Sequence, residues 1–139
     1  MLLLEATKRY TLGKQERLKS RKLIDQLFKE GLFFNFFPIR VVWHYQQSST
    51  AKLQAGFAVS TRHFKKAVDR NRIKRLMREA YRLQKNDLQD DIENSGHQLA
   101  VFLIYVGKEI PDYLLIKEKM KGTLNRLQKL VHDENTRNT

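Results

Sequence analysis

The run from Leu99 to Val106 constrains the fold of this chain more than any other segment. Its side chains are almost wholly apolar, and it contains the β-branched residues Val101 and Ile104. A strand of this kind has no face suited to water, so the run predicts a central strand that is buried on both sides of a sheet. The chain has 139 residues, of which 41% are hydrophobic, and this fits one domain with one core.

Further strands are predicted on the N-terminal side of this run. Residues 32–45 are rich in aromatic and β-branched residues, and Pro38 divides them, so we expect a bend or two short strands there. After the proline the side chains alternate between two faces, one formed by Ile39, Val41, Trp43 and Tyr45 and the other by Arg40, Val42 and His44.

Residues 53–59 predict another strand, antiparallel to the one that follows Pro38. One face of this strand carries only small side chains, among them Gly56 and Ala58. Small side chains leave the backbone accessible, so we expect another group to approach it closely on that face.

Three helices are predicted around these strands. The first follows the N-cap residue Ser20 and ends at Gly31. The second runs from His63 or Lys66 to Lys85, and the third begins at Pro111. The acidic segment 87–96 is expected to be a loop.

The predicted order of elements is αββ(β)αβα. It describes a single α+β domain over residues 1–139 with a mixed four-stranded sheet, a basic arm at 1–19 and a frayed tail at 133–139.

The formal net charge of +12 is concentrated in the first part of the chain. Residues 1–85 contain 20 Lys and Arg against 6 Asp and Glu, a net of +14, whereas residues 86–139 contain 7 against 9, a net of −2. A one-sided charge distribution indicates a docking face for a polyanion, such as a nucleic acid or an anionic membrane.

The densest basic segment is the long helix. On the side opposite its apolar residues, Arg70, Lys74, Arg78 and Arg82 follow one another at intervals of four. Three successive like-charged pairs of this spacing cost about 1 kcal/mol in the free protein, and we predict no acidic partner for them. A phosphate backbone accounts for that cost better than a solvated face or a membrane surface does.

Other classes of function find little support in the sequence. The chain has no cysteine, and its four histidines show neither metal-ligand spacing nor the arrangement of a catalytic triad. It has no glycine-rich phosphate loop and no paired-carboxylate site, so we expect no active site, no metal site and no small-molecule substrate. Neither a signal peptide nor a membrane span is predicted, and a cytoplasmic location is expected.

The motifs of the chain resemble those of the bacterial ribonuclease P protein component. The segments that carry the resemblance are Gly56-Phe-Ala-Val-Ser60, Lys65-Lys-Ala-Val and Arg70-Asn-Arg-Ile-Lys-Arg-Leu-Met-Arg-Glu79, with the short helix that ends Leu27-Phe28-Lys29-Glu30-Gly31. The resemblance covers residues 16–106 well and the last helix loosely. It implies a central cleft formed by a helix and the sheet, and a left-handed βαβ crossover through the basic helix, against the general rule.

The resemblance also implies partners and site residues. The family acts with a large catalytic RNA, whose Mg²⁺ ions belong mainly to the RNA, to remove the 5′ leader of precursor tRNA. The residues that match the motif that contacts the catalytic RNA, extended along the same helix by Arg82, are Arg70, Asn71, Arg72, Lys74, Arg75, Arg78 and Arg82.

The leader is expected in the cleft, where Phe28 offers a base-stacking surface. Ile24 stands where many members have phenylalanine, Val42 where some have tyrosine, and Tyr105 where many have a basic residue. Of the residues Phe33–Phe37 we expect three or four to be buried and one or two to face RNA. The predicted cleft residues are Ile24, Phe28, Arg40, Val42, His44, Ser60 and Arg62.

The leading hypothesis is therefore the protein subunit of ribonuclease P, which binds the catalytic RNA and the leader and provides no catalytic side chain. A structural ribosomal or general RNA-binding protein explains the charge equally well, but it does not explain a cleft for single strands.

Overall fold

Four strands form one mixed sheet in the computed structural model, which describes residues 10–46 and 51–137. The strand order is β1-β2-β4-β3; β4 runs antiparallel to β2 and parallel to β3. The elements are η1 (Lys14–Glu16), α2 (Arg21–Glu30), β1 (Leu32–Phe36), β2 (Ile39–Gln46), β3 (Leu53–Val59), α3 (Ala67–Gln84), α4 (Asn86–Ser95), β4 (Gln98–Tyr105) and α5 (Tyr113–Arg137).

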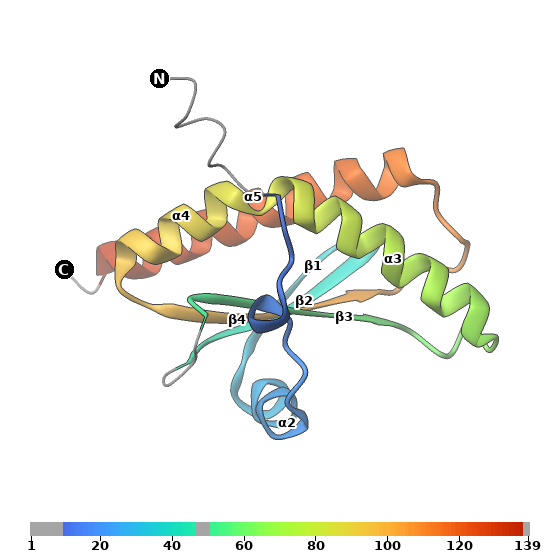
Figure 1. Ribbon diagram of the computed structural model, residues 1–139, viewed down its shortest axis with the longest axis horizontal. Coiled ribbons are helices and arrows are strands. Elements are labelled where there is room, and N and C mark those ends of the chain that lie inside the picture. The colour runs from blue at the N-terminus through green and yellow to red at the C-terminus, as the bar shows by residue number, and fades with distance from the viewer. Residues whose placement is uncertain (1–9, 47–50, 138–139) are drawn as a thin grey trace.

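The predicted central strand is confirmed as β4. It has a hydrogen-bonded neighbour on each side, and its residues Leu99–Leu103 are all buried. Helices α3, α4 and α5 cover one face of the sheet, and α2 lies alone against the other (Figure 1). The two faces hold separate clusters of buried apolar side chains, a large one under α3 and α5 and a small one under α2.

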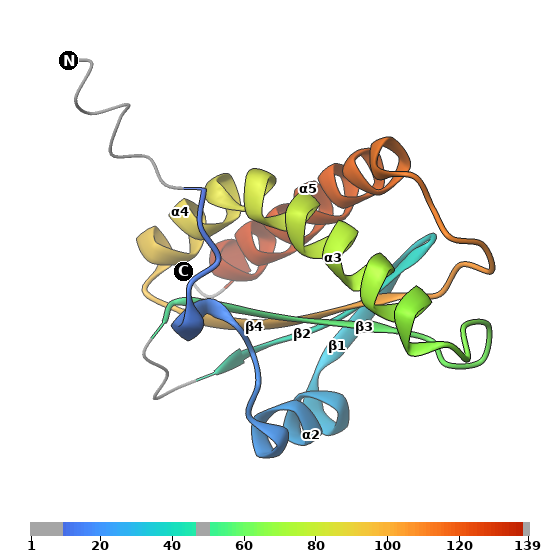
Figure 2. The same cartoon turned by 45° about the vertical axis from the view of Figure 1, so that its right-hand side comes forward.

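The connection from β3 to β4 is left-handed, as the family resemblance implied. In Figure 1 both strands run from left to right below α3 and α4, and Figures 1 and 2 together place β3 in front of β4. Seen from the helices with the strands pointing upward, β4 therefore lies to the left of β3. Nearly all parallel βαβ connections have the opposite hand.

Strands β2 and β3 run in opposite directions, as predicted, but they are not neighbours in the sheet. Strand β4 is inserted between them and forms the ladders with both. The pattern of side chains in a strand describes its two faces and carries no information about which strand is its neighbour.

The segment 87–96 is the helix α4 and not the loop that its acidic composition suggested. Leu88 and Ile92 lie one turn apart and are both buried, and α4 packs against α5. Gly96 ends the helix in the left-handed region with φ of +77°. The apolar pair and the glycine are the sequence signals for this helix.

The last helix also extends farther than predicted. α5 continues to Arg137, so residues 133–137 are helical where a frayed tail was expected. The other helix predictions are confirmed, since Ser20 caps α2 with its hydroxyl, Gly31 is the C-cap of α2, and α3 spans Ala67–Gln84.

The predicted basic arm is partly docked on the domain. Residues 1–9 lie outside the described part of the chain, but Leu12 and Leu18 are buried, and Arg17 forms an isolated parallel bridge with Ala55 of β3. The buried ammonium group of Lys85 forms an ion pair with Glu16. The arm thereby leads from the C-terminal end of α3, around the edge strand β3, to α2 (Figure 2).

Candidate nucleic-acid interface

Helix α3 presents one face to the core and another to solvent. Its buried side chains are Ile73, Met77, Ala80 and Tyr81, and Tyr81 packs edge-on against Phe57 of β3 at 5.5 Å between ring centres. This burial fixes the helix rotation, so the solvent face is set by packing against the sheet and α5.

The most exposed basic stripe differs slightly from the predicted ladder. Arg72, Arg75 and Arg78 are exposed at successive intervals of three residues, and Asn71 is exposed beside them. Residues 70, 74 and 82 are only half-exposed. The centre of the basic face therefore does not follow the line through residues 70, 74, 78 and 82. It is rotated about the helix axis by a fraction of a turn.

The two ends of the predicted ladder make hydrogen bonds within the protein. Arg70 Nη1 donates to the carbonyl oxygens of Phe64 and Lys65 at 2.9 and 2.8 Å, in the loop that leads into α3. Part of the Arg70 guanidinium therefore holds the start of the helix.

Arg82, at the other end of the ladder, has an acidic partner, contrary to the prediction. Its Nε and Nη2 atoms donate to the Glu79 carboxylate at 3.1 and 2.5 Å, and its Nη1 donates to the carbonyl of Tyr10 in the arm. The hydrogen bond from Arg82 lowers the pKa of Glu79 below its usual value. The strongest unpaired positive charge therefore lies in the middle of α3.

The second candidate surface is the sheet face under α2. The register β2–β4 places Arg40, Val42 and His44 on this face, opposite Ile104, Phe102 and Ala100, as the alternation predicted. Arg40 and His44 have different surroundings, because they are four residues, or about 13 Å, apart along β2.

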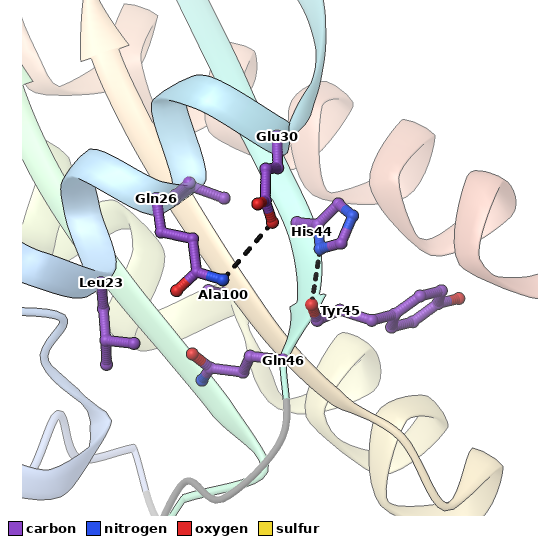
Figure 3. A pocket seen from close by; sticks show the side chains of 8 residues that line it. Leu23, Gln26, Glu30, His44, Tyr45, Gln46 and Ala100 are labelled. Carbon is purple, nitrogen blue, oxygen red and sulfur yellow. Dashed lines mark hydrogen bonds between the residues drawn. The ribbon is translucent and has the colours of Figure 1, made fainter.

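His44 lines a hollow of about 360 Å³ that runs along one side of α2, from Leu23 to Glu30 (Figure 3). Its Nδ1 atom lies 2.6 Å from the Tyr45 carbonyl oxygen; a carbonyl can only accept, so Nδ1 carries the proton. Across the hollow, Gln26 donates to Glu30 within α2 at 3.4 Å. This end of the face is therefore polar, with a carboxylate in its wall.

Arg40 lines a different hollow, of about 420 Å³, with Ser60 and Arg62. The Arg40 Nε atom donates to the Asn35 side-chain oxygen at 3.0 Å, which orients the guanidinium. The structure thus unites three of the predicted cleft residues and places His44 at the opposite end.

The other predicted cleft residues lie beneath or on α2. Val42 is buried and only 5% exposed, since α2 and the tight approach of Gly31 cover it. Ile24 is half-buried against the same small cluster, so neither offers a stacking surface. Phe28 is 49% exposed and meets Phe102 edge-on at 5.3 Å between ring centres, which leaves part of its ring open to solvent.

The small side chains of β3 do allow a close approach, as predicted, but the chain itself fills the space. A Cβ atom on Gly56 would lie 2.6 Å from the Phe102 ring and 3.3 Å from the Leu18 carbonyl oxygen. The space beside Gly56 is therefore filled, and the open parts of this face are the two hollows at His44 and at Arg40.

The aromatic stretch 33–37 is less buried than predicted. Phe34 is buried and Phe36 half-buried, whereas Phe33 and Phe37 are 72% and 71% exposed. Strict alternation along β1, with Phe33 opposite Val42 and Phe34 opposite Val41, explains the exposure of Phe33, whereas Phe37 lies in the turn that follows the strand. The same alternation in the sequence is the signal that would have identified Phe33 as exposed.

The chain is similar to known proteins both in sequence and in structure. A family model described as Ribonuclease P matches residues 12–128. The ribonuclease P protein component of Porphyromonas gingivalis is 35% identical over 119 residues, covering 85% of this chain and 87% of its own. That of Chlorobium phaeobacteroides is 33% identical over 130 residues, covering 85% and 88%.

The chain belongs to the ribonuclease P protein component family. Among solved structures, the ribonuclease P protein of Thermotoga maritima superimposes with a TM-score of 0.59 at 25% identity, covering 80% of this chain and 96% of its own. A Staphylococcus aureus ribonuclease P protein mutant does so with a TM-score of 0.66 at 20% identity, covering 83% and 90%. Membership implies an RNA partner and a place in ribonuclease P.

Tyr105, for which the resemblance predicted a position close to phosphate, makes a contact within the protein instead. It is buried, and its hydroxyl donates to the Glu109 carbonyl at 2.6 Å. Burial raises the pKa of this phenol above its ordinary value. Tyr105 therefore holds the segment between β4 and α5 and presents no charge to a phosphate.

Within residues 10–46 and 51–137, no three His, Asp or Glu side chains are grouped closely enough to hold a metal ion. None of the helices in the described ranges is long and apolar enough to cross a membrane.

Proposed function

We propose that this protein is the subunit of ribonuclease P that binds the catalytic RNA through α3 and the 5′ leader of precursor tRNA through the α2 side of the sheet. The observation that carries the proposal is the exposed stripe Arg72, Arg75 and Arg78 within the segment that the family model matches. Arginines of this kind bind phosphate oxygens by charge and by hydrogen bonds in a planar fork.

Each of the two surfaces binds a different RNA. The rigid helix α3 anchors the protein on the catalytic RNA, with Asn71, Lys74 and the half-exposed Arg70 and Arg82 at its borders. Phe28 stacks on a leader base while Arg40, Ser60 and Arg62 contact the leader backbone. Because the leader is held beside the cleavage site, the affinity for precursor tRNA exceeds that for mature tRNA.

The chain contributes binding and positioning, and the reaction itself takes place in the RNA subunit. The Mg²⁺ ions that the RNA requires are bound by the RNA, and no side chain of this protein has a catalytic role. Positive charge on the protein lowers the concentration of Mg²⁺ at which the RNA is active, since both neutralise phosphates. We place the assembly in the cytoplasm.

The test is to mix the full chain with a bacterial ribonuclease P RNA and end-labelled precursor tRNA at low Mg²⁺. We expect the protein to accelerate leader removal, and a chain that leaves the rate unchanged would contradict the proposal. A general RNA-binding protein is distinguished by equal affinities for precursor tRNA with and without a leader in the presence of the catalytic RNA.

A further inference from the structure

The exposed phenylalanines of this protein are gathered on one side of the molecule. Of its 8 phenylalanines, three are exposed, namely Phe28, Phe33 and Phe37. Phe28 lies on α2, Phe33 lies on β1 opposite Val42 of the α2 face, and Phe37 lines the hollow that contains Arg40 and Arg62. The sheet face under α3 and α5 holds only buried or half-buried phenylalanines.

Phe33 and Phe37 are spaced along the outer edge of the sheet. Within residues 10–46 and 51–137, strand β1 pairs only with β2, and Phe33 faces the α2 side of the sheet. Phe37 follows in the turn between β1 and β2 and lines the hollow beside Arg40. Between them Asn35 faces the same side and accepts the hydrogen bond from Arg40. The edge therefore alternates aromatic, polar and aromatic groups, with a fixed arginine beside the middle one.

The charge around this edge is positive. Residues 31–46 contain no Asp or Glu. From the other side of the sheet, Arg126 of α5 lies 4.8 Å from the centre of the Phe34 ring and donates to the Asn35 carbonyl at 3.3 Å. Arg40 and Arg126 thus flank β1 on its two faces, and both are exposed.

We propose that the β1 edge is a stacking track for additional nucleotides of the single-stranded leader, continuing from Phe28 to Phe33 and Phe37. Exposed aromatic rings next to guanidinium groups are the usual platform for single-stranded nucleic acid, because every base has a face that can stack. The track is continuous with the surface assigned above to the leader, and the inference rests on that proposed function.

The track makes affinity depend on leader length. A short leader reaches only Phe28, whereas a longer leader also covers Phe33 and Phe37. Loss of one stacking ring lowers the affinity about tenfold, and loss of both lowers it by up to about a hundredfold. Both rings are more than 70% exposed, so their removal leaves the core intact.

The experiment measures the affinity of the complex with ribonuclease P RNA for precursor tRNA with leaders of about two and about ten nucleotides. We expect Phe33→Ala and Phe37→Ala to weaken binding of the long leader about tenfold each and to leave the short leader unaffected. Leu114→Ala, which removes an apolar side chain 73% exposed on α5, is the matched control and should change neither affinity.

Two further variants separate stacking from other uses of this edge. Phe33→Trp should preserve the affinity for the long leader and Phe33→Leu should lose it, since leucine keeps the apolar surface but has no ring. If Phe33→Trp and Phe33→Leu retain the same affinity for the long leader, the track is wrong and the edge is an apolar docking surface. The same conclusion follows if the free protein sediments as a dimer and Phe33→Ala abolishes that dimer.

Failure of the track is distinct from failure of the proposed function. If Phe28→Ala weakens leader binding while Phe33→Ala and Phe37→Ala do not, the track is wrong and the subunit role stands. If the unaltered protein gives no preference for a leader of either length, both proposals are wrong.

Discussion

The exposed face of α3 and the α2 side of the sheet differ in what they present to a ligand. The α3 face is a row of guanidinium groups on one helix, and the phenylalanine that packs against Tyr81 of α3, Phe57, is half-buried under the helix. The α2 side has fewer charges, three exposed phenylalanines and two hollows. A surface of charge suits the phosphates of a folded RNA, whereas a surface of rings and hollows suits the bases of a single strand.

The difference also appears in how each surface is built. Rotation of α3 is fixed by four buried side chains, so its arginines are placed by a rigid element. The α2 side depends on a short helix that packs on a small cluster and joins β1 through Gly31. Gly31 allows this approach because a Cβ there would lie 2.9 Å from Val42 and even closer to the Leu27 carbonyl.

The largest expected effect comes from removing the centre of the α3 face. The triple change of Arg72, Arg75 and Arg78 to alanine should lower the affinity for ribonuclease P RNA about a hundredfold in 0.1 M salt and reduce the salt slope by two to three, approximately one for each phosphate contact. Filter binding across a salt series measures both.

The control for that variant is the triple change of Lys117, Lys121 and Lys129 to alanine, which removes the same charge from exposed positions on α5. If the two triple variants lose the same affinity for ribonuclease P RNA, binding depends on net charge and not on the α3 face. The proposed difference between the α3 face and the α2 side would then be wrong.

An intermediate effect is expected for Phe28→Ala. Loss of one stacking ring should lower the affinity for precursor tRNA about fivefold to tenfold and leave the affinity for mature tRNA and the salt slope unchanged. Leu32→Ala is a suitable control, because Leu32 is 56% exposed and pairs with Trp43 of the opposite sheet face. An equal loss for mature tRNA would show that Phe28 supports the fold and not the leader.

The smallest effect is expected for Glu79→Gln, which removes the acidic partner from the end of the α3 face. Without this carboxylate Arg82 is free to bind phosphate, so RNA affinity should rise about twofold to threefold with a slightly steeper salt slope. A fall in affinity would show that the Glu79–Arg82 pair orders the interface.

The same variant has a pH signature in thermal unfolding. The pKa of Glu79 is lowered in the folded state, so its contribution to stability is present above its unfolded value of 4.5 and is lost as the pH falls below it. Between pH 7 and pH 3 the Tm of Glu79→Gln should fall slightly less than that of the unaltered protein. The difference is small because both side chains of the pair are open to solvent.

The residues of β2 show how much of the candidate site can be predicted from the sequence alone. The period of two after Pro38 placed Arg40, Val42 and His44 on one face, and the alternation of the strand confirmed it. The same residues lie in three environments, since Val42 is covered by α2 and the other two line different hollows. Coverage depends on where α2 docks, and the pattern of β2 alone holds no information about that.

The basic residues of α3 likewise show which features the sequence predicts and which it does not. Their spacing predicted a basic face, but the predicted partnerless ladder ends in Arg82, which is bound to Glu79 and to the arm, and begins with Arg70, which is bound to loop carbonyls. The Glu79–Arg82 pair has the i,i+3 spacing of neighbours on one helix, so helical periodicity could have predicted it. The bonds to Tyr10 and to the loop carbonyls join α3 to irregular segments, which helical periodicity does not describe.

The sequence by itself determined most of the elements, the buried central strand, the basic helix and the motifs that identify the family, because each depends on residues near one another in the chain. The tertiary structure decided that β4 separates β2 from β3, that α2 covers Val42, that Arg40 and His44 line different hollows, and that the middle of α3 carries the open charge. Those outcomes depend on which surfaces meet, and burial is a property of the whole packed domain.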